Sequence, residues 1–239
     1  MCFSPFVSYA AAGILIPAGA VAMLRAYQRD PQYLAIAALP ALFGFQQLFE
    51  GAVWTAGNQG AGDWIQRFSL AYMFFTWFAW PVWVPFATYF LEPCARRHIY
   101  LVFAIFGGIL GAMQFIPYFA HEGWLEVKFF DYAISYEGTV LFDLIMRREL
   151  TYLFYLSVIL APLLTSSKRG LNVFGLLILG VLAITYTFFR YAYISVFCFG
   201  GAAMSLYLVY MIFHETGRSY KASNPVDLDQ KPLSSPSIC

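Results

Sequence analysis

Two glutamines and one glutamate interrupt an apolar stretch of the chain, at Gln46, Gln47 and Glu50 in the sequence ALFGFQQLFEGAVW. In a helix, which turns by about 100° per residue, these three side chains fall within one arc of about 100°. They would share a single face, with Gly51 and Trp54 just above them. A carboxylate beside two carboxamides has the hydrogen-bonding groups to hold a small ligand or an ion.

The composition places this polar face inside a membrane. Of the 239 residues, 61% are hydrophobic and only 11% are charged, with a mean hydropathy of +0.65. Soluble domains carry about 25% charged residues. An ionised carboxylate in hydrocarbon costs at least a few kcal/mol, so the face that carries Glu50 should point into a helix bundle and away from lipid.

Seven apolar segments are long enough to read as membrane helices. They are Pro5–Leu24, Tyr33–Thr55, Phe68–Leu91, Ile99–Phe119, Leu150–Thr165, Asn172–Phe188 and Tyr193–Phe213. Ser4 and Pro5 form a favourable start for the first helix, as N-cap and first helical residue. Gly107 and Gly111 are spaced to allow a close approach between two helices. The predicted fold is therefore an all-α, seven-helix transmembrane bundle.

The distribution of Lys and Arg predicts the orientation of this bundle. One side holds nine of these residues: Arg25, Arg29, Arg96, Arg97, Lys168, Arg169, Arg218, Lys221 and Lys231. The other side holds five: Arg67, Lys128, Arg147, Arg148 and Arg190. The richer side should be cytoplasmic, which places the N-terminus outside, the C-terminus inside, and Glu50 roughly 8 Å from the outer end of its helix.

Two segments are predicted to lie outside the spans. The outer loop at residues 120–149 contains KFFDYAISYEG, whose strand-like alternation up to Gly138 indicates a short hairpin or an interfacial cap over the bundle. The tail at residues 217–239 is polar and rich in Ser and Pro, and is expected to be disordered in the cytoplasm. The transmembrane domain is accordingly predicted at residues 1–216.

Several residues could complete a site around Glu50. Arg190, near the outer end of the last two helices, is the expected counter-charge. Other candidates at a similar depth are Tyr9, Tyr72, Gln114, Tyr186, Tyr191 and Tyr193, and Trp77, Trp80 and Trp83 could form an aromatic wall. Cys2 precedes the first helix at the same end, where a thiolate could act as a nucleophile or a ligand if its pKa were lowered.

Other classes of protein are disfavoured. His98, His121 and His214 fall on different sides of the membrane, which argues against a multi-histidine zinc site or a bis-histidine haem. No lysine in the last span could form a retinal Schiff base. The placement of the histidines and lysines therefore predicts no metal and no cofactor. The net charge is +1 and no nucleic-acid motif is present, so the sequence predicts no nucleic-acid partner.

The opening Met1-Cys2-Phe3-Ser4, the segment FGFQQLFEGAVW and the segment AWPVWVPFATYFLEP resemble an uncharacterised family of bacterial multi-pass membrane proteins. The resemblance is concentrated in the first hundred residues. It implies that certain residues match the family pattern, namely Cys2, Phe3, Ser4, Gln46, Gln47, Glu50, Gly51, Trp54, Trp80 and Pro81. It implies a bacterial inner (plasma) membrane location, with the lipid bilayer as a partner, and no activity.

Three hypotheses follow for the function. The first is binding of a small molecule or ion in an outward-facing polar pocket, as carrier or sensor, by Gln46, Gln47, Glu50, Trp54, Arg190 and Cys2. The second is an integral membrane enzyme that uses Cys2 and Glu50. The third is a structural or accessory subunit, in which the polar side chains only join helices. A cavity at Glu50 and its distance from Cys2 would discriminate among them.

Overall fold

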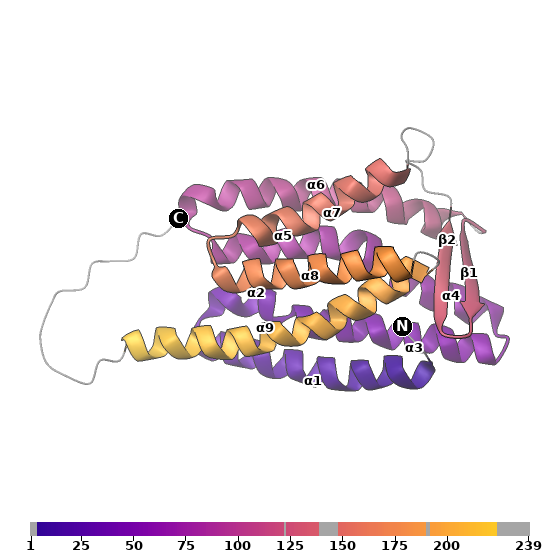
Figure 1. Cartoon of the computed structure of the whole chain (residues 1–239), viewed down its shortest axis with the longest axis horizontal. Coiled ribbons are helices and arrows are strands. Elements are labelled where there is room, and N and C mark those ends of the chain that lie inside the picture. The colour runs from indigo at the N-terminus through magenta and orange to yellow at the C-terminus, as the bar shows by residue number, and fades with distance from the viewer. Residues whose placement is uncertain (1–3, 122, 139–147, 190–191, 224–239) are drawn as a thin grey trace, which may run out of the picture.

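The computed structural model of the chain is a bundle of long helices with one β-hairpin at its end (Figure 1). The structure describes residues 4–121, 123–138, 148–189 and 192–223. The helices are α1 (Pro5–Arg29), α2 (Leu34–Ala37), α3 (Leu39–Asn58), α4 (Gly62–Met73), α5 (Trp80–Leu91), α6 (Cys94–Ala120), α7 (Arg148–Thr165), α8 (Arg169–Phe188) and α9 (Tyr193–Ser223). A short 3-10 helix, η1 (Pro31–Tyr33), precedes α2, and a π-helix, η2 (Phe74–Ala79), joins α4 to α5.

Six helical stretches are long and apolar enough to cross a membrane. They are Pro5–Arg29, Pro31–Asn58, Gly62–Leu91, Cys94–Ala120, Arg169–Phe188 and Tyr193–Gly217, and the apolar helix Leu150–Thr165 is shorter. Each of the seven predicted segments lies within one of these helices, which confirms a helical, multi-pass membrane protein. Large apolar side chains exposed on the bundle surface, such as Ile14, Val102 and Leu176, indicate contact with the lipid bilayer.

The first helix begins as predicted and runs further than predicted. The Ser4 hydroxyl accepts a hydrogen bond from the backbone N–H of Val7 at 3.4 Å, and Pro5 is the first helical residue. The helix continues to Arg29, beyond the predicted end of the apolar segment, because Arg25 and Arg29 interrupt the hydrophobicity without breaking the helix.

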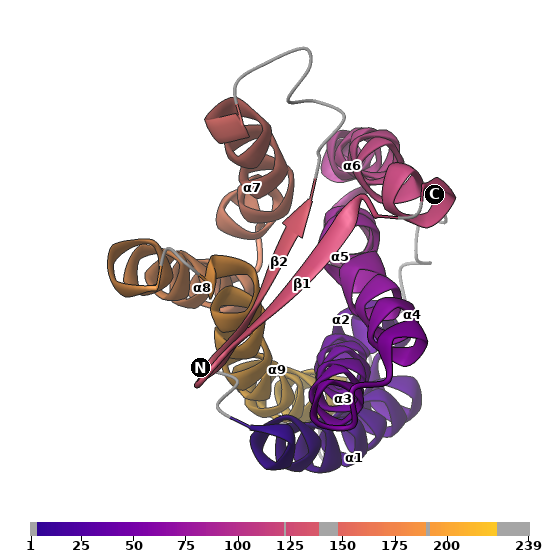
Figure 2. The same ribbon diagram turned by 90° about the vertical axis from the view of Figure 1, so that its right-hand side faces the viewer.

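Seen from the hairpin end, the helices surround a packed centre (Figure 2). Helix α1 packs against α3 and α9, α5 packs against α6 and α7, and α8 lies between α7 and α9. The stretches that contain α3 and α4–α5 are the most buried, whereas α1, α6 and α8 expose most of their surface. Helix α3, which carries the polar face, is therefore central in the bundle.

Glycines on α6 face two carbonyls that lack their α-helical donor. Pro81 and Pro85 have no N–H, so the carbonyls of Trp77 and Pro81 receive no hydrogen bond from the residue four positions later. A Cβ at Gly107 would lie 2.0 Å from the Pro81 oxygen, and one at Gly111 would lie 2.6 Å from the Trp77 oxygen. The predicted close approach of Gly107 and Gly111 is confirmed, and it brings their Cα–H groups to these carbonyls.

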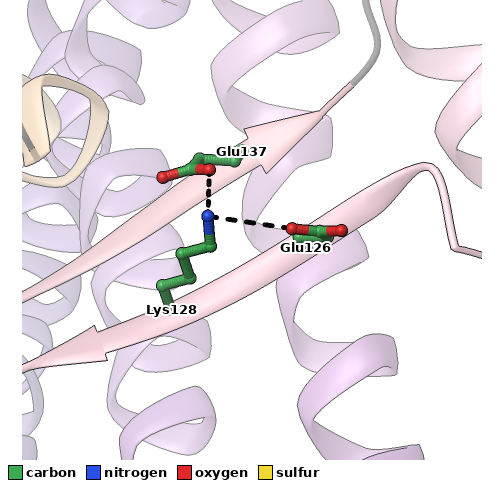
Figure 3. A network of polar contacts seen from close by, with 3 residues as sticks. All are labelled: Glu126, Lys128 and Glu137. Atoms are coloured by element: carbon green, nitrogen blue, oxygen red, sulfur yellow. Dashed lines mark hydrogen bonds and ion pairs between the residues drawn. The ribbon is translucent and has the colours of Figure 1, made fainter.

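The hairpin consists of antiparallel strands β1 (Leu125–Phe130) and β2 (Ala133–Gly138), which cross the end of the helix bundle (Figure 2). The predicted hairpin in the loop between α6 and α7 is thus confirmed. On its exposed face, Lys128 donates a hydrogen bond to Glu137 and lies 3.8 Å from Glu126 (Figure 3). The hydrogen bond to Glu137 raises the pKa of Lys128. Residues Ala133–Tyr136 of β2 are instead buried against the helices.

Candidate functional site

The polar face of α3 is completely buried. Gln46, Gln47 and Glu50 each have 0% of their surface exposed, as expected for polar groups that face a bundle interior. The Ser195 hydroxyl on α9 donates a hydrogen bond to Glu50 Oε1 at 2.6 Å, across 145 residues of sequence. Glu50 thus joins α3 to α9 in the interior of the bundle.

Gln46 is the centre of a second set of hydrogen bonds. Its Nε2 donates to Thr76 Oγ1 at 3.0 Å, and its Oε1 accepts from the indole N–H of Trp80 at 3.2 Å. Both ends of the carboxamide are therefore engaged, which fixes its orientation. The Thr76 hydroxyl also lies 3.7 Å from the Cys198 sulfur on α9, a distance at which a thiol can share a weak hydrogen bond.

The π-helix η2 positions Thr76 and leaves its carbonyl without a backbone donor. The Trp80 N–H donates to the Phe75 oxygen, five residues earlier, and so is not available to Thr76. The next residue, Pro81, has no N–H to offer. The Tyr155 hydroxyl on α7 donates to the Thr76 oxygen instead. Single π-turns inside α-helices are frequent at functional sites, where they redirect side chains in this way.

These contacts define one polar core cluster drawn from several helices. Its members are Gln46, Glu50, Thr76, Trp80, Tyr155, Ser195 and Cys198. Tyr72 and Gln46 also lie beside the Cys198 thiol, and Glu50 is near enough to act on it electrostatically. Of these neighbours, Tyr72 was among the tyrosines predicted to complete the site.

The other predicted binding residues are placed only in part. Cys2 and Arg190, together with Tyr191, lie outside the described residues. Gln47 is buried within the same face of α3, and Trp54 is buried one turn above Glu50.

Four of the remaining candidates on other helices meet different partners or lie elsewhere. Tyr9 shares a hydrogen bond of 3.0 Å with Thr55 on the exposed side of α3. Tyr186 is 62% exposed and so faces away from the bundle interior. Gln114 is buried on α6, and Tyr193 shares a hydrogen bond with the hydroxyl of Tyr152.

The predicted wall of three tryptophans is divided between the cluster and ordinary packing. Trp80 supplies the indole donor to Gln46. Trp83 donates to the Ala35 carbonyl at 2.9 Å, whereas Trp77 stacks on Tyr152. One tryptophan of the three therefore belongs to the site by a direct hydrogen bond.

Four cluster members were not predicted from the sequence, namely Thr76, Tyr155, Ser195 and Cys198. A small hydroxyl in an apolar helix is usually bonded to its own backbone, so Thr76 and Ser195 give no distinctive signal. Ser195 and Cys198 are three residues apart, a spacing that places them on the same face of a helix. That spacing is visible in the sequence, but its relation to Glu50 is not.

A small cavity lies beside the cluster, with a volume of about 30 Å³. Trp80 and Cys198 belong to its wall, and the other residues that line it are Phe43, Val84, Ile159, Leu163, Phe174, Ile178, Phe197 and Gly201. Its lining is apolar and includes neither Glu50 nor the two glutamines, so this cavity is not the outward-facing polar pocket predicted at Glu50. Cavities of this character are dry.

A second buried carboxylate lies at the opposite end of the bundle from the hairpin. Glu92 is 2% exposed, and its Oε1 accepts hydrogen bonds from the Ser166 hydroxyl at 2.5 Å and from the Ser167 N–H at 2.8 Å. Arg97 donates to the Glu92 carbonyl at 2.9 Å. These bonds join the turn between α5 and α6 to the turn between α7 and α8, which is the pattern of a structural connection.

Comparison with known proteins places the chain in a family but gives it no activity. Residues 1–224 match the model of DUF6629, which is described as a family of unknown function. No curated protein and no solved structure matches the chain. The comparison therefore agrees with the predicted membership of an uncharacterised family, and any function must be argued from the geometry of the site.

Proposed function

This chain belongs to DUF6629, and we propose that it binds a small ligand or ion at the polar core cluster around Glu50, as a membrane carrier or sensor. One observation carries the proposal: a glutamate with no exposed surface sits in a membrane helix, in a network of polar groups to which four other helical segments contribute. Ionisable residues within membrane helices are costly and usually mark substrate, ion or proton sites.

In this proposal three residues of the cluster have distinct roles. Glu50 supplies the charge, with Arg190 as its counter-charge, and Ser195 holds one carboxylate oxygen by the 2.6 Å hydrogen bond. Gln46 is held at both ends of its carboxamide and presents a fixed polar surface to the ligand. A purely structural connection needs only one good hydrogen bond between two helices, and the cluster contains several.

We also propose that the hairpin end is the outer one and that the C-terminus is cytoplasmic. Among the described residues, the end opposite the hairpin carries Arg25, Arg29, Arg96, Arg97, Lys168 and Arg169. The hairpin end carries Arg67, Lys128 and, at the start of α7, Arg148. Cytoplasmic loops are rich in Lys and Arg, which supports this orientation.

The test compares Glu50→Gln with Glu137→Gln, a matched removal of one carboxylate from the exposed face of the hairpin. Purified full-length protein is screened by thermal unfolding against a fixed panel of sodium, potassium and ammonium salts, amino acids and sugars. A ligand present at about 100 times its Kd stabilises by about 2.7 kcal/mol. We expect at least one compound to raise the Tm of the wild type and of Glu137→Gln but not that of Glu50→Gln.

The same comparison discriminates against a structural role. Gln is nearly isosteric with Glu and can still accept the hydrogen bond from Ser195. If Glu50 is retained for binding at a cost in stability, the Glu50→Gln protein should be as stable as the wild type or more stable. If Glu50→Gln lowers the Tm by several degrees while every compound acts equally on both variants, Glu50 is a structural connection and the proposal is wrong.

A further inference from the structure

We infer that the β-hairpin is a removable cover of the polar core cluster, so that a water-soluble solute reaches Glu50 past the hairpin and not sideways from the lipid. That a solute uses this route rests on the proposed function. That the hairpin covers the cluster and can move away from it rests on the contacts of the hairpin with the helices, and this part is tested without any ligand.

The hairpin contacts three helices about one turn above members of the cluster. On α3, Trp54 lies four residues after Glu50, and its ring is 5.7 Å from that of Phe129. A helical turn rises about 5.4 Å, so the hairpin sits directly over the level of Glu50 on this helix. The ring of Phe129 also covers Gly57, where a Cβ would lie 2.5 Å from it.

The contacts on α4 and α9 repeat this relation. Tyr136 of β2 stacks on Tyr72 with ring centroids 4.8 Å apart, and Tyr72 lies four residues before Thr76. Ala133 packs with Ala192, the residue just before the start of α9, which lies three residues before Ser195. Because these helices run away from the hairpin while α3 runs toward it, the contact residues all lie between the hairpin and the cluster.

These contacts are of a kind that can separate. Stacked ring pairs add only modest stabilisation beyond their buried area, and a two-stranded hairpin is marginally stable by itself. The chain enters the hairpin through Gly123, which has a φ of +83° and where an added Cβ would meet no atom within 4 Å. A glycine in open space with this backbone conformation offers little resistance to rotation of the hairpin.

The other approaches to the cluster are less suited to a polar solute. A path from the side crosses hydrocarbon, where an unpaired polar group loses its hydrogen bonds to water. A path from the opposite end meets the apolar cavity lined by Phe43, Val84 and their neighbours, and beyond it the connection made by Glu92. At the water-facing end, the contacts described above that hold the hairpin to the helices are aromatic and apolar pairs.

Cys198 reports on this route because its thiol is buried and free, and it lies in the cluster. The experiment measures the rate at which N-ethylmaleimide alkylates Cys198 in the purified full-length protein, by mass spectrometry of its peptide. Ala133→Cys together with Ala192→Cys ties the hairpin to α9 when oxidised. We expect alkylation of Cys198 in the oxidised protein to be at least ten times slower than in the same variant reduced.

A control and an opposite perturbation complete the test. Glu126→Cys with Glu137→Cys forms a disulfide across the exposed face of the hairpin without tying it to a helix, and should leave the rate unchanged. Tyr136→Ala removes the ring that stacks on Tyr72, and should raise the rate several-fold while the protein still unfolds cooperatively. Equal rates in the oxidised and reduced Ala133–Ala192 pair, or an unchanged rate in Tyr136→Ala, overturn the inference.

The outcomes for the cover and for the ligand site are separable. Suppose that the locked hairpin protects Cys198 and that Glu50→Gln responds to every compound as the wild type does. This result supports the cover and contradicts the proposed function. Ligand binding that depends on Glu50, with alkylation of Cys198 unaffected by the lock, supports the site and contradicts the route.

Discussion

We expect the hydroxyl of Tyr155 to contribute more to the free energy of unfolding than a typical tyrosine hydroxyl, because it donates to a carbonyl that has no backbone N–H donor. The Thr76 oxygen loses the Trp80 N–H to Phe75, and Pro81 has none to give. Tyr155 is buried and donates to this oxygen. In Tyr155→Phe the carbonyl stays buried without a donor, at a cost of about 1–3 kcal/mol.

Tyr100→Phe provides the matched control. Tyr100 is also buried, and its hydroxyl also donates to a backbone carbonyl, that of Thr165, at 3.0 Å. Thr165 is the exposed last residue of α7, where water can replace the lost donor. We therefore expect Tyr100→Phe to cost about 1 kcal/mol or less. Unfolding of the purified protein by denaturant, followed by circular dichroism, measures both free energies of unfolding.

A double mutant tests the cause of the difference. Pro81→Ala restores an N–H five residues after Thr76, which continues the π-helical pattern begun by Trp80 and Phe75. In the Pro81→Ala background, Tyr155→Phe should therefore cost less than in the wild type, with a coupling of about 1 kcal/mol. The reasoning is refuted if the two tyrosine substitutions cost the same, or if the effects of Pro81→Ala and Tyr155→Phe are strictly additive.

Three further predictions concern other parts of the bundle. Ser166→Ala removes a hydrogen bond to the buried Glu92 carboxylate and should lower the free energy of unfolding by about 1.5–3 kcal/mol. The control is Ser157→Ala, because the Ser157 hydroxyl is exposed and donates to the Leu153 carbonyl of its own helix. This substitution should change the free energy of unfolding by less than about 0.5 kcal/mol in the same denaturant titration. Gly107→Ala should prevent the close packing of α6 on α5 and reduce the yield of folded protein in gel filtration, whereas Gly108→Ala, which has only a 3.5 Å contact to Val82, should not. A reporter active only in the cytoplasm should be active after the last residue of the chain, and inactivity there would reverse the proposed orientation.

The helices and the burial of the polar face could be predicted from the sequence because each depends on local pattern. Hydrophobic length identifies a membrane helix, and the 100° turn between residues places Gln46, Gln47 and Glu50 on one face. Their complete burial follows from the cost of polar groups in hydrocarbon. The strand-like alternation before Gly138 predicted the hairpin for the same reason.

The partners of that face could not be predicted, because they depend on which helices meet and at what height. Nothing in the local sequence indicates that Ser195 lies against Glu50, 145 positions earlier, or that Cys198 lies beside Thr76. The π-helix was also missed, since its hydrogen-bond register is decided by packing around Trp80 and Pro81. The segment with three tryptophans suggested an aromatic wall, but the segment contributes to the site chiefly through the π-helical hydrogen-bond pattern that positions Thr76.

The π-helix and the cluster are best understood as one arrangement. Prolines at positions 81 and 85 remove two donors from a membrane helix, and such losses are tolerated only where neighbouring groups supply replacements. The glycines of α6 face the two carbonyls that lose these donors, and Tyr155 on α7 donates to the Thr76 carbonyl that the π-helix leaves without a donor, so the irregular segment is held from two sides. The same irregularity turns the Thr76 hydroxyl toward Gln46 and Cys198. A site that must present polar groups at a fixed height gains from this geometry, and this is our reason for proposing a binding role, and not only a structural one, for the Glu50 cluster.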